Sequence, residues 1–87
     1  MACFIITYDV REGGDYAELI SAIKAYGSWA QIAQSAWAVV AKSDAETVRD
    51  DLCALLPEGS RLFVVKSGAE AAWHNVACSN EWLKRNL

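Results

Sequence analysis

The side chains that could do chemistry in this sequence are few, and the first of them closes an apolar run. The stretch FIITYDV, residues 4–10, places Tyr8 and Asp9 near its end. A carboxylate at a strand end commonly accepts hydrogen bonds from loop N–H groups. No second acidic residue follows Asp9 until Glu12, so only pairing between subunits would turn this carboxylate into a site. We therefore expect a structural Asp9 in a single chain, beside a core Tyr8 whose hydroxyl lies at the rim.

The cysteines and the single histidine form no recognisable metal motif. Cys3, Cys53 and Cys78 are odd in number, no C-x-x-C occurs, and His74 stands alone in the C-terminal segment. This pattern argues against a closed zinc site and predicts an exposed or hydrogen-bonded His74 without a catalytic role. Because Cys3 and Cys53 lie in apolar patterns, we expect both to be buried free thiols in a reducing compartment.

The chain is small and apolar for its size. It has 87 residues, of which 54% are hydrophobic, and it contains four tryptophans. A domain of this length has a limited interior, because folding buries only about 60–65% of the surface of the unfolded chain. The excess of apolar side chains predicts a surface for a partner, most simply a second copy of the same chain.

The charge pattern disfavours nucleic acid as a partner. The formal net charge is −3, and the eight Lys and Arg residues are scattered, with Lys84-Arg85 as the largest cluster. Binding of nucleic acid depends on a basic surface that neutralises phosphates. The chain shows no basic leader and no apolar run of the ~20 residues that a membrane span needs. We therefore expect a cytoplasmic protein without a membrane partner.

Apolar periodicity predicts a strand and then a helix in the first third of the chain. Residues 3–9 are β-branched and aromatic on both faces, which is typical of a central strand covered on both sides. A turn at 11–14 follows. We expect Asp15, with Glu18, to cap the next helix and Gly27 to end it.

Residues 28–41 allow two interpretations. Their alanines favour a helix, but Trp, Ile and Val recur without a helical stripe. We predict strands at 28–33 and 36–42, joined by a tight reversal at Gln34 and Ser35, and keep a helix as the alternative.

The second half of the chain repeats the alternation of helix and strand. Ser43 with Glu46 predicts the start of a second helix, and a turn at 57–60 leads to a strand at 61–66. The resulting order, β-α-β-β-α-β, is that of an α+β, ferredoxin-like domain over residues 1–66. In that arrangement an antiparallel sheet carries both helices on one face.

The C-terminal extension, residues 67–87, is surplus to that domain. Ser79 or Asn80 is expected to cap a short helix whose apolar stripe includes Trp82. A tail with two tryptophans must pack somewhere, and the open sheet face or a dimer partner is the natural place. Packing in the core or an interface, rather than stacking on bases, is also expected for three aromatic residues: Trp37, Phe63 and Trp73.

Several motifs together resemble a known family. A first strand ending in Tyr8-Asp9, QSAW at 34–37 and GSRLFVV at 59–65 resemble the small CRISPR-associated ferredoxin-fold family. Its members act as metal-dependent nucleases or as the structural dimer between spacer-integrase subunits. With EAAWHNV and EWLKRNL in the tail, the chain is most similar to the SinR-like branch of that family, which comprises uncharacterised bacterial and phage proteins.

The resemblance implies a metal site shared by two chains. In that family an aspartate at the end of the first strand lies near its symmetry mate, and two such carboxylates can hold one Mg²⁺ or Mn²⁺; Asp9 occupies this place. Such an ion could activate a water against a phosphodiester. Ser35 matches the family's serine at the start of the third strand, which either contacts phosphate or shapes the turn.

Two hypotheses follow, and the acidic charge favours the first. The first is a homodimeric structural or interaction protein that works through a protein partner without catalysis. The second is a metal-dependent nuclease acting on RNA or DNA, in which Asp9 of each chain holds the metal and Ser35 assists.

Overall fold

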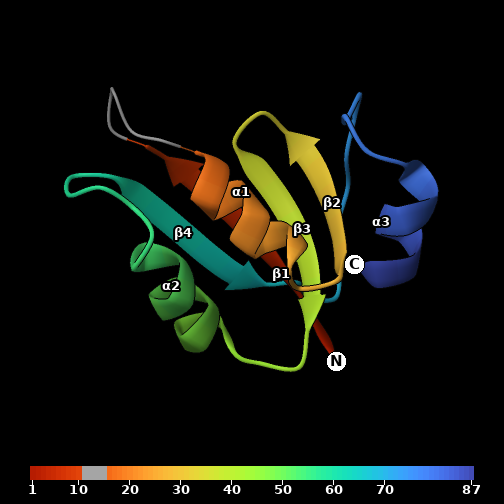
Figure 1. Cartoon of the computed structure of the whole chain (residues 1–87). Helices are drawn as coiled ribbons and strands as arrows, with labels where there is room; N and C mark the ends of the chain where they lie inside the picture. The colour runs from red at the N-terminus through yellow and green to blue at the C-terminus, as the bar shows by residue number, and fades with distance from the viewer. Residues whose placement is uncertain (11–15) are drawn as a thin grey trace.

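The chain folds as an α+β protein. The computed structural model describes residues 1–10 and 16–87, and in this part four strands form one antiparallel sheet accompanied by three helices (Figure 1). In chain order the elements are β1 (Ala2–Asp9), α1 (Ala17–Lys24), β2 (Ser28–Ala33), β3 (Ala36–Ala41), α2 (Ala45–Cys53), β4 (Arg61–Lys66) and α3 (Asn80–Asn86). The expected α+β class is confirmed. Among these three helices, none has the length and apolar character needed to cross a membrane.

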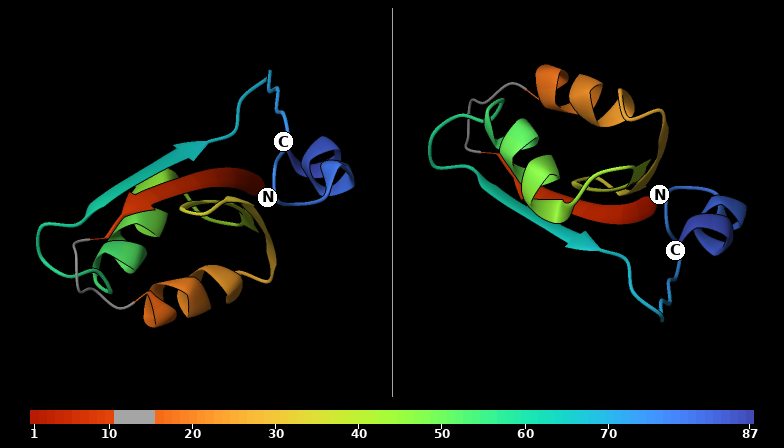
Figure 2. Two further views of the ribbon diagram at one scale, coloured as in Figure 1. Left: turned by 90° about the horizontal axis from the view of Figure 1, so that it is seen from above. Right: turned by 90° about the horizontal axis from the view of Figure 1, so that it is seen from below.

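The sheet is organised around β1. The strand order is β2-β3-β1-β4, and β1 pairs antiparallel with both β3 and β4. Phe4, Ile6 and Tyr8 alternate onto one face of β1 and are buried there. Figure 2 shows α1 and α2 on the same side of the sheet, over this face. We call it the inner face, and the opposite side the outer face.

The segment from Ser28 to Ala41 forms two strands, so the strand prediction is confirmed and the helical alternative is wrong. Gln34 and Ser35 make the expected reversal between β2 and β3. The carbonyl of Ser35 accepts a hydrogen bond from the N–H of Tyr8 at 3.1 Å, which ties the reversal to β1. Pairing with a buried central strand therefore outweighs the helix propensity of the alanines.

The beginning of α1 lies close to the part of the chain that is not described. The expected turn at 11–14 and the expected cap Asp15 fall outside the described residues. The N-cap position of α1 is Tyr16, whose side chain makes no capping hydrogen bond. Gly27 follows the helix with φ of +96°, a left-handed conformation that suits glycine, as expected.

The cap of α2 is Asp44, and the prediction of Ser43 was wrong. The N–H of Thr47 donates to Oδ1 of Asp44 at 2.8 Å, and this hydrogen bond lowers the pKa of the Asp44 carboxyl. Asp44 also has the extended backbone of a cap residue, with φ of −131° and ψ of 167°. Ser and Asp are both good caps, so the sequence could not decide between two adjacent candidates.

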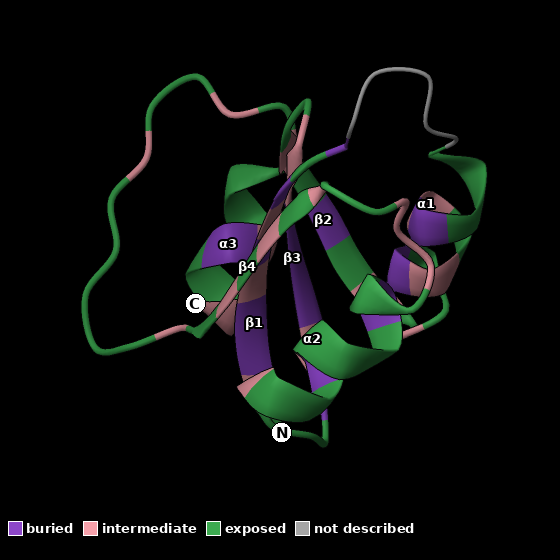
Figure 3. Ribbon diagram, turned by 90° about the vertical axis from the view of Figure 1, so that its left-hand side faces the viewer, coloured by how far each residue is buried: buried purple, intermediate pink, exposed green. Residues whose placement is uncertain are grey.

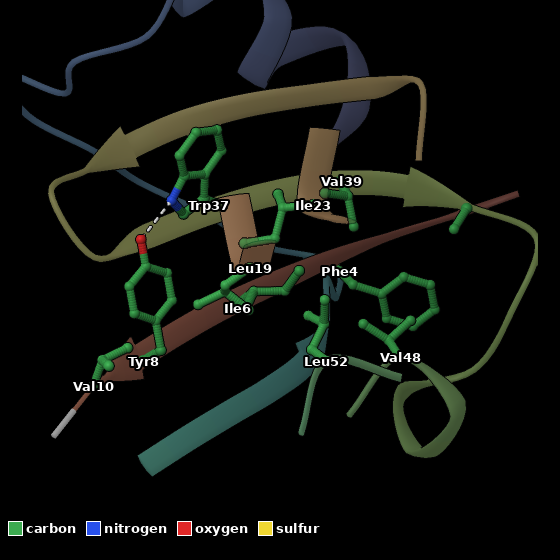
Figure 4. Packing of buried hydrophobic residues seen from close by; sticks show 11 residues of the cluster. Phe4, Ile6, Tyr8, Val10, Leu19, Ile23, Trp37, Val39, Val48 and Leu52 are labelled. Atoms are coloured by element: carbon green, nitrogen blue, oxygen red, sulfur yellow. Dashed lines mark hydrogen bonds between the residues drawn. The ribbon is translucent and has the colours of Figure 1, made fainter. Parts of the chain in front are cut away.

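The hydrophobic core fills the space between the inner face and the two helices (Figure 4). Four helix residues are buried against the sheet: Leu19, Ile23, Val48 and Leu52. Trp37 of β3 is only 2% exposed, and its Nε1–H donates to the hydroxyl of Tyr8 at 3.1 Å. The expectation of a core Tyr8 is confirmed, and its hydroxyl is the partner of a buried indole.

The chain after β4 returns to the other edge of the sheet. The N–H of Ala77 donates to the carbonyl of Ile32 at 2.9 Å, beside edge strand β2. Ser79 caps α3, as predicted, by accepting from two N–H groups of its first turn. Leu83 of α3 is buried and lines a recess together with Ile5, which points to the outer face of β1. This extension therefore covers part of the outer face.

The outer face of β4 remains uncovered. Phe63 is 62% exposed and Val65 is 42% exposed, although both are large apolar residues in a strand. Figure 3 shows exposed and half-buried residues alternating along β4, whereas β1 and β3 are largely buried. The uncovered part of the outer face thus belongs to the half of the sheet formed by β1 and β4.

One of the two cysteines expected in the core is on the surface. Cys3 is buried, but Cys53 is exposed. Cys53 directly follows the buried Leu52 on α2, and successive helical side chains point about 100° apart. An apolar neighbour in the sequence is therefore no guide to burial in a helix. His74 is exposed, in agreement with the expectation.

Tyr8→Phe removes the partner of the buried Trp37 Nε1–H. We expect the free energy of unfolding to fall by about 1–3 kcal/mol, because the indole N–H would stay buried without an acceptor. Urea unfolding followed by tryptophan fluorescence measures the change. Tyr16→Phe removes a hydroxyl from an exposed ring and should cost less than about 0.5 kcal/mol. Equal losses in the two variants would contradict the assigned hydrogen bond.

Asp44→Ala should lower the melting temperature at neutral pH, and Ser43→Ala should leave it nearly unchanged. The pKa of the Asp44 carboxyl is lowered in the folded state, so its stabilising effect is present above the pKa of the unfolded chain, ordinarily 3.8. The effect is lost as the pH falls through the lower folded-state pKa. Thermal unfolding followed by circular dichroism should therefore show wild type and Asp44→Ala converging in acid. A constant difference at all pH values would argue against the cap.

Candidate functional site

Asp9 lies on the outer face, where β1 leaves the sheet. The register pairs it with Arg61, the first residue of β4, and Nη1 of Arg61 donates to Oδ2 of Asp9 at 3.4 Å. The side chain of Arg61 is 84% exposed and that of Asp9 71% exposed. Water screens an ion pair this exposed, so the pair contributes little to stability and leaves the carboxylate accessible.

A shallow hollow of about 200 Å³ lies beside this ion pair. Its walls come from β1 and β4: Thr7, Tyr8, Asp9, Arg61, Leu62 and Phe63. The hollow combines one acid, one base and the exposed ring of Phe63. Because the two charges offset each other, the hollow attracts ions of neither sign strongly. Its mixture of an aromatic ring and a charged pair is closer to that of a protein contact surface.

Ser35 and Asp9 line different hollows of one chain, and Tyr8 lines both. It is half-buried in the reversal between β2 and β3 and lines a recess with Tyr16 and Gln34. Asp9 lines the hollow beside β4. The observed contact of Ser35 is made by its carbonyl, which holds the N–H of Tyr8, and this contact accords with a turn residue.

The described residues offer no ready-made metal centre. In residues 1–10 and 16–87 there is no group of three or more His, Cys, Asp or Glu side chains that could hold an ion. Mg²⁺ needs several oxygen ligands, whereas Asp9 provides a single carboxylate that already faces the guanidinium of Arg61. The described side chains of one chain therefore make no complete site, and the shared site that the resemblance implies would need Asp9 of a second chain as well.

The buried thiol of Cys3 is not an activated nucleophile. Burial raises its pKa, so the thiol stays protonated at neutral pH. Reactive cysteines are instead accessible and have a lowered pKa. Cys3 therefore belongs to the packing of β1.

The structure brings together two basic residues that sequence reasoning treated as scattered. Lys42 and Lys66 line the same recess at the end of the sheet where β1 begins. The sequence held one signal for them, because each lysine is followed by serine, at 42–43 just after β3 and at 66–67 where β4 ends.

Comparisons with protein-family models, with curated proteins and with solved structures find no significant match to this chain.

Proposed function

We propose that this protein is a small homodimeric interaction protein without catalytic activity of its own. The observation that carries the proposal is the uncovered half of the outer face, where Phe63 is 62% and Val65 is 42% exposed. Exposed apolar residues that are neighbours on one strand face are typical of contact surfaces. Thr7, which pairs with Phe63 across the β1–β4 ladder, extends the same surface.

A second copy of the chain is the occupant that this surface suits. Covering a Phe or Val side chain completely is worth about 1.5–3 kcal/mol relative to leaving it exposed. In a two-fold dimer both copies of each such residue are buried. The free energy gained from one small patch is therefore counted twice per dimer. The C-terminal extension forms a recess with Ile5 and Val65, but Phe63 does not line that recess and is 62% exposed, so the surface around Phe63 remains free for this contact.

Contact through the face is favoured over pairing of the β4 edges. β4 begins with Arg61 and ends with Lys66. If two copies paired these edges antiparallel and in register, Arg61 of each copy would lie opposite Lys66 of the other. Like charges directly opposite each other across strands are destabilising, and charged residues on an edge strand commonly prevent such pairing.

We assign the fold at the finer level to the ferredoxin-like βαββαβ type with a C-terminal extension. The order β1-α1-β2-β3-α2-β4 and the central position of β1 and β3 in the sheet support this assignment. The same assignment supports kinship with the CRISPR-associated family and its SinR-like branch. The free thiols of Cys3, Cys53 and Cys78 agree with a reducing, cytoplasmic location.

A metal-dependent nuclease is the second candidate, and the position of Asp9 is the observation that favours it. Asp9 lies on the same face as Phe63, so a dimer formed through that face would direct two Asp9 side chains toward the contact. One ion with oxygen contacts of about 2.1 Å cannot bridge carboxylates more than about 10 Å apart. This candidate ranks second because Arg61 already pairs with the carboxylate.

Phe63→Glu should convert the dimer into a monomer. The substitution places an unpaired charge in the contact, which is costly to bury. Sedimentation equilibrium over a range of concentrations measures the association constant, and we expect it to fall at least about tenfold, which corresponds to about 1.4 kcal/mol. Gln34→Glu adds the same charge at the exposed reversal between β2 and β3 and is the matched control.

Two outcomes decide whether the chain dimerises through Phe63. A wild-type protein that remains monomeric at the highest concentration would overturn it. If Phe63→Glu and Gln34→Glu lowered the association constant equally, net charge would explain the effect. Phe63 would then not lie in the contact.

Wild-type protein should show no Mg²⁺- or Mn²⁺-dependent cleavage of labelled RNA or DNA beyond that of Asp9→Asn. The reason is that one carboxylate facing Arg61 does not make a metal site. Asp51→Asn removes an exposed carboxylate from α2 and serves as the control. Cleavage that persists in Asp51→Asn and disappears in Asp9→Asn would establish the nuclease and refute the non-catalytic assignment.

A further inference from the structure

Two Lys-Ser pairs lie at the end of the sheet opposite Asp9, where β1 begins. Lys42-Ser43 follows β3 and Lys66-Ser67 ends and follows β4. Because β3 and β4 both run antiparallel to β1, both end where β1 begins, as Figure 1 shows near the N-terminus. The topology therefore brings Lys42 and Lys66, which are 24 positions apart in the sequence, to the same end of the sheet.

These residues line a recess of about 480 Å³. Its polar walls are Lys42, Ser43, Lys66, Ser67 and the backbone of Gly68, and the end of α3 completes it. None of the lining residues has an acidic side chain, although the chain as a whole carries a net charge of −3. The volume lies within the range of about 300–1,000 Å³ that is usual for small-molecule sites.

The backbone holds the two pairs in place while their charged ends stay free. Ala41, directly before Lys42, pairs with Ala2, and the N–H of Ser67 donates to the carbonyl of Cys3 at 2.8 Å. Both strand ends are thus fixed to the start of β1. Within residues 1–10 and 16–87, neither Lys42 nor Lys66 takes part in an ion pair with an acidic side chain. Their ammonium groups remain available to a ligand.

We propose that this recess binds a small phosphate-bearing anion. Two ammonium groups and two hydroxyls supply donors for the several acceptor oxygens of a phosphate or diphosphate, and charge-assisted hydrogen bonds of this kind are the strong ones. Lysine acts here as a mobile point charge that can follow the ligand. The site is independent of the uncovered outer face at Phe63 and does not depend on dimerisation.

The ligand is a small molecule rather than a nucleic acid. Nucleic acid needs a basic surface that follows its backbone over many phosphates. Here the positive charge is confined to one recess, and the other adjacent basic pair, Lys84-Arg85 on α3, does not line it. The acidic remainder of the chain repels a long polyanion but not a compact one.

Titration of the protein with inorganic pyrophosphate, followed by ¹H–¹⁵N NMR at constant ionic strength, tests the proposal. We expect saturable shifts at the amides of Lys42, Ser43, Ser67 and Gly68, and none at Asp9. The double variant Lys42→Gln/Lys66→Gln should weaken binding by about tenfold or more, because each lost charge-assisted hydrogen bond is worth about that factor. Both lysines are exposed, so the variant retains the core.

Lys84→Gln/Arg85→Gln is the matched control, since it removes the same two charges outside the recess. It should weaken binding of pyrophosphate clearly less than the recess variant does, because neither side chain lines the recess and exposed charges are screened by water and salt. If both double variants weakened binding equally, net charge alone would explain the affinity for pyrophosphate. The proposed site would then be wrong. An absence of saturable shifts, or displacement of pyrophosphate by a single-stranded oligonucleotide at far lower concentration, would also overturn it.

Discussion

The pairing of β1 with β3 on one side and β4 on the other is the constraint on which the rest of the structure depends. It presents Phe4, Ile6 and Tyr8 as one continuous inner surface, and α1 and α2 have their apolar stripes buried against that surface. In a chain of 87 residues this is the only large apolar layer among the described residues, since its members form a single core cluster. A protein this small has little stability to spare, so the buried Trp37–Tyr8 hydrogen bond inside that layer matters for its integrity.

The same pairing places the charged side chains of Asp9, Lys42 and Lys66 at the two opposite ends of the sheet. Asp9 leaves the sheet at one end of β1, beside Arg61, where acid and base offset each other. At the other end the two strands that flank β1 deliver Lys42 and Lys66 to one recess without an acidic side chain. An acidic protein thereby has a recess lined by two lysines and by no acidic side chain. The arrangement follows from antiparallel neighbours alone, because both must end where the central strand begins.

The outer face explains why so apolar a chain is expected to have a partner. Its C-terminal extension buries Leu83 near Ile5 and hydrogen-bonds to β2 at Ile32, and the recess that it forms with the sheet reaches Val65 but not Phe63. Phe63 and Val65 stay 62% and 42% exposed beside the elements that the structure describes. The resulting division, one sheet half covered by the chain itself and one half uncovered, is the physical basis of the proposed self-association.

The sequence by itself determined the elements, because periodicity and capping are local properties. It predicted the two strands either side of Gln34 and Ser35, the left-handed Gly27 and a cap at Ser79 or Asn80, but it chose Ser43 where Asp44 caps α2. It also placed Asp9 correctly at the end of a strand, but not its partner Arg61, which is 52 positions away. Tertiary structure alone decided that Phe63 is uncovered and that Lys42 and Lys66 line one recess. These outcomes depend on which strands become neighbours, and that pairing joins residues too distant in the chain for any local pattern to record.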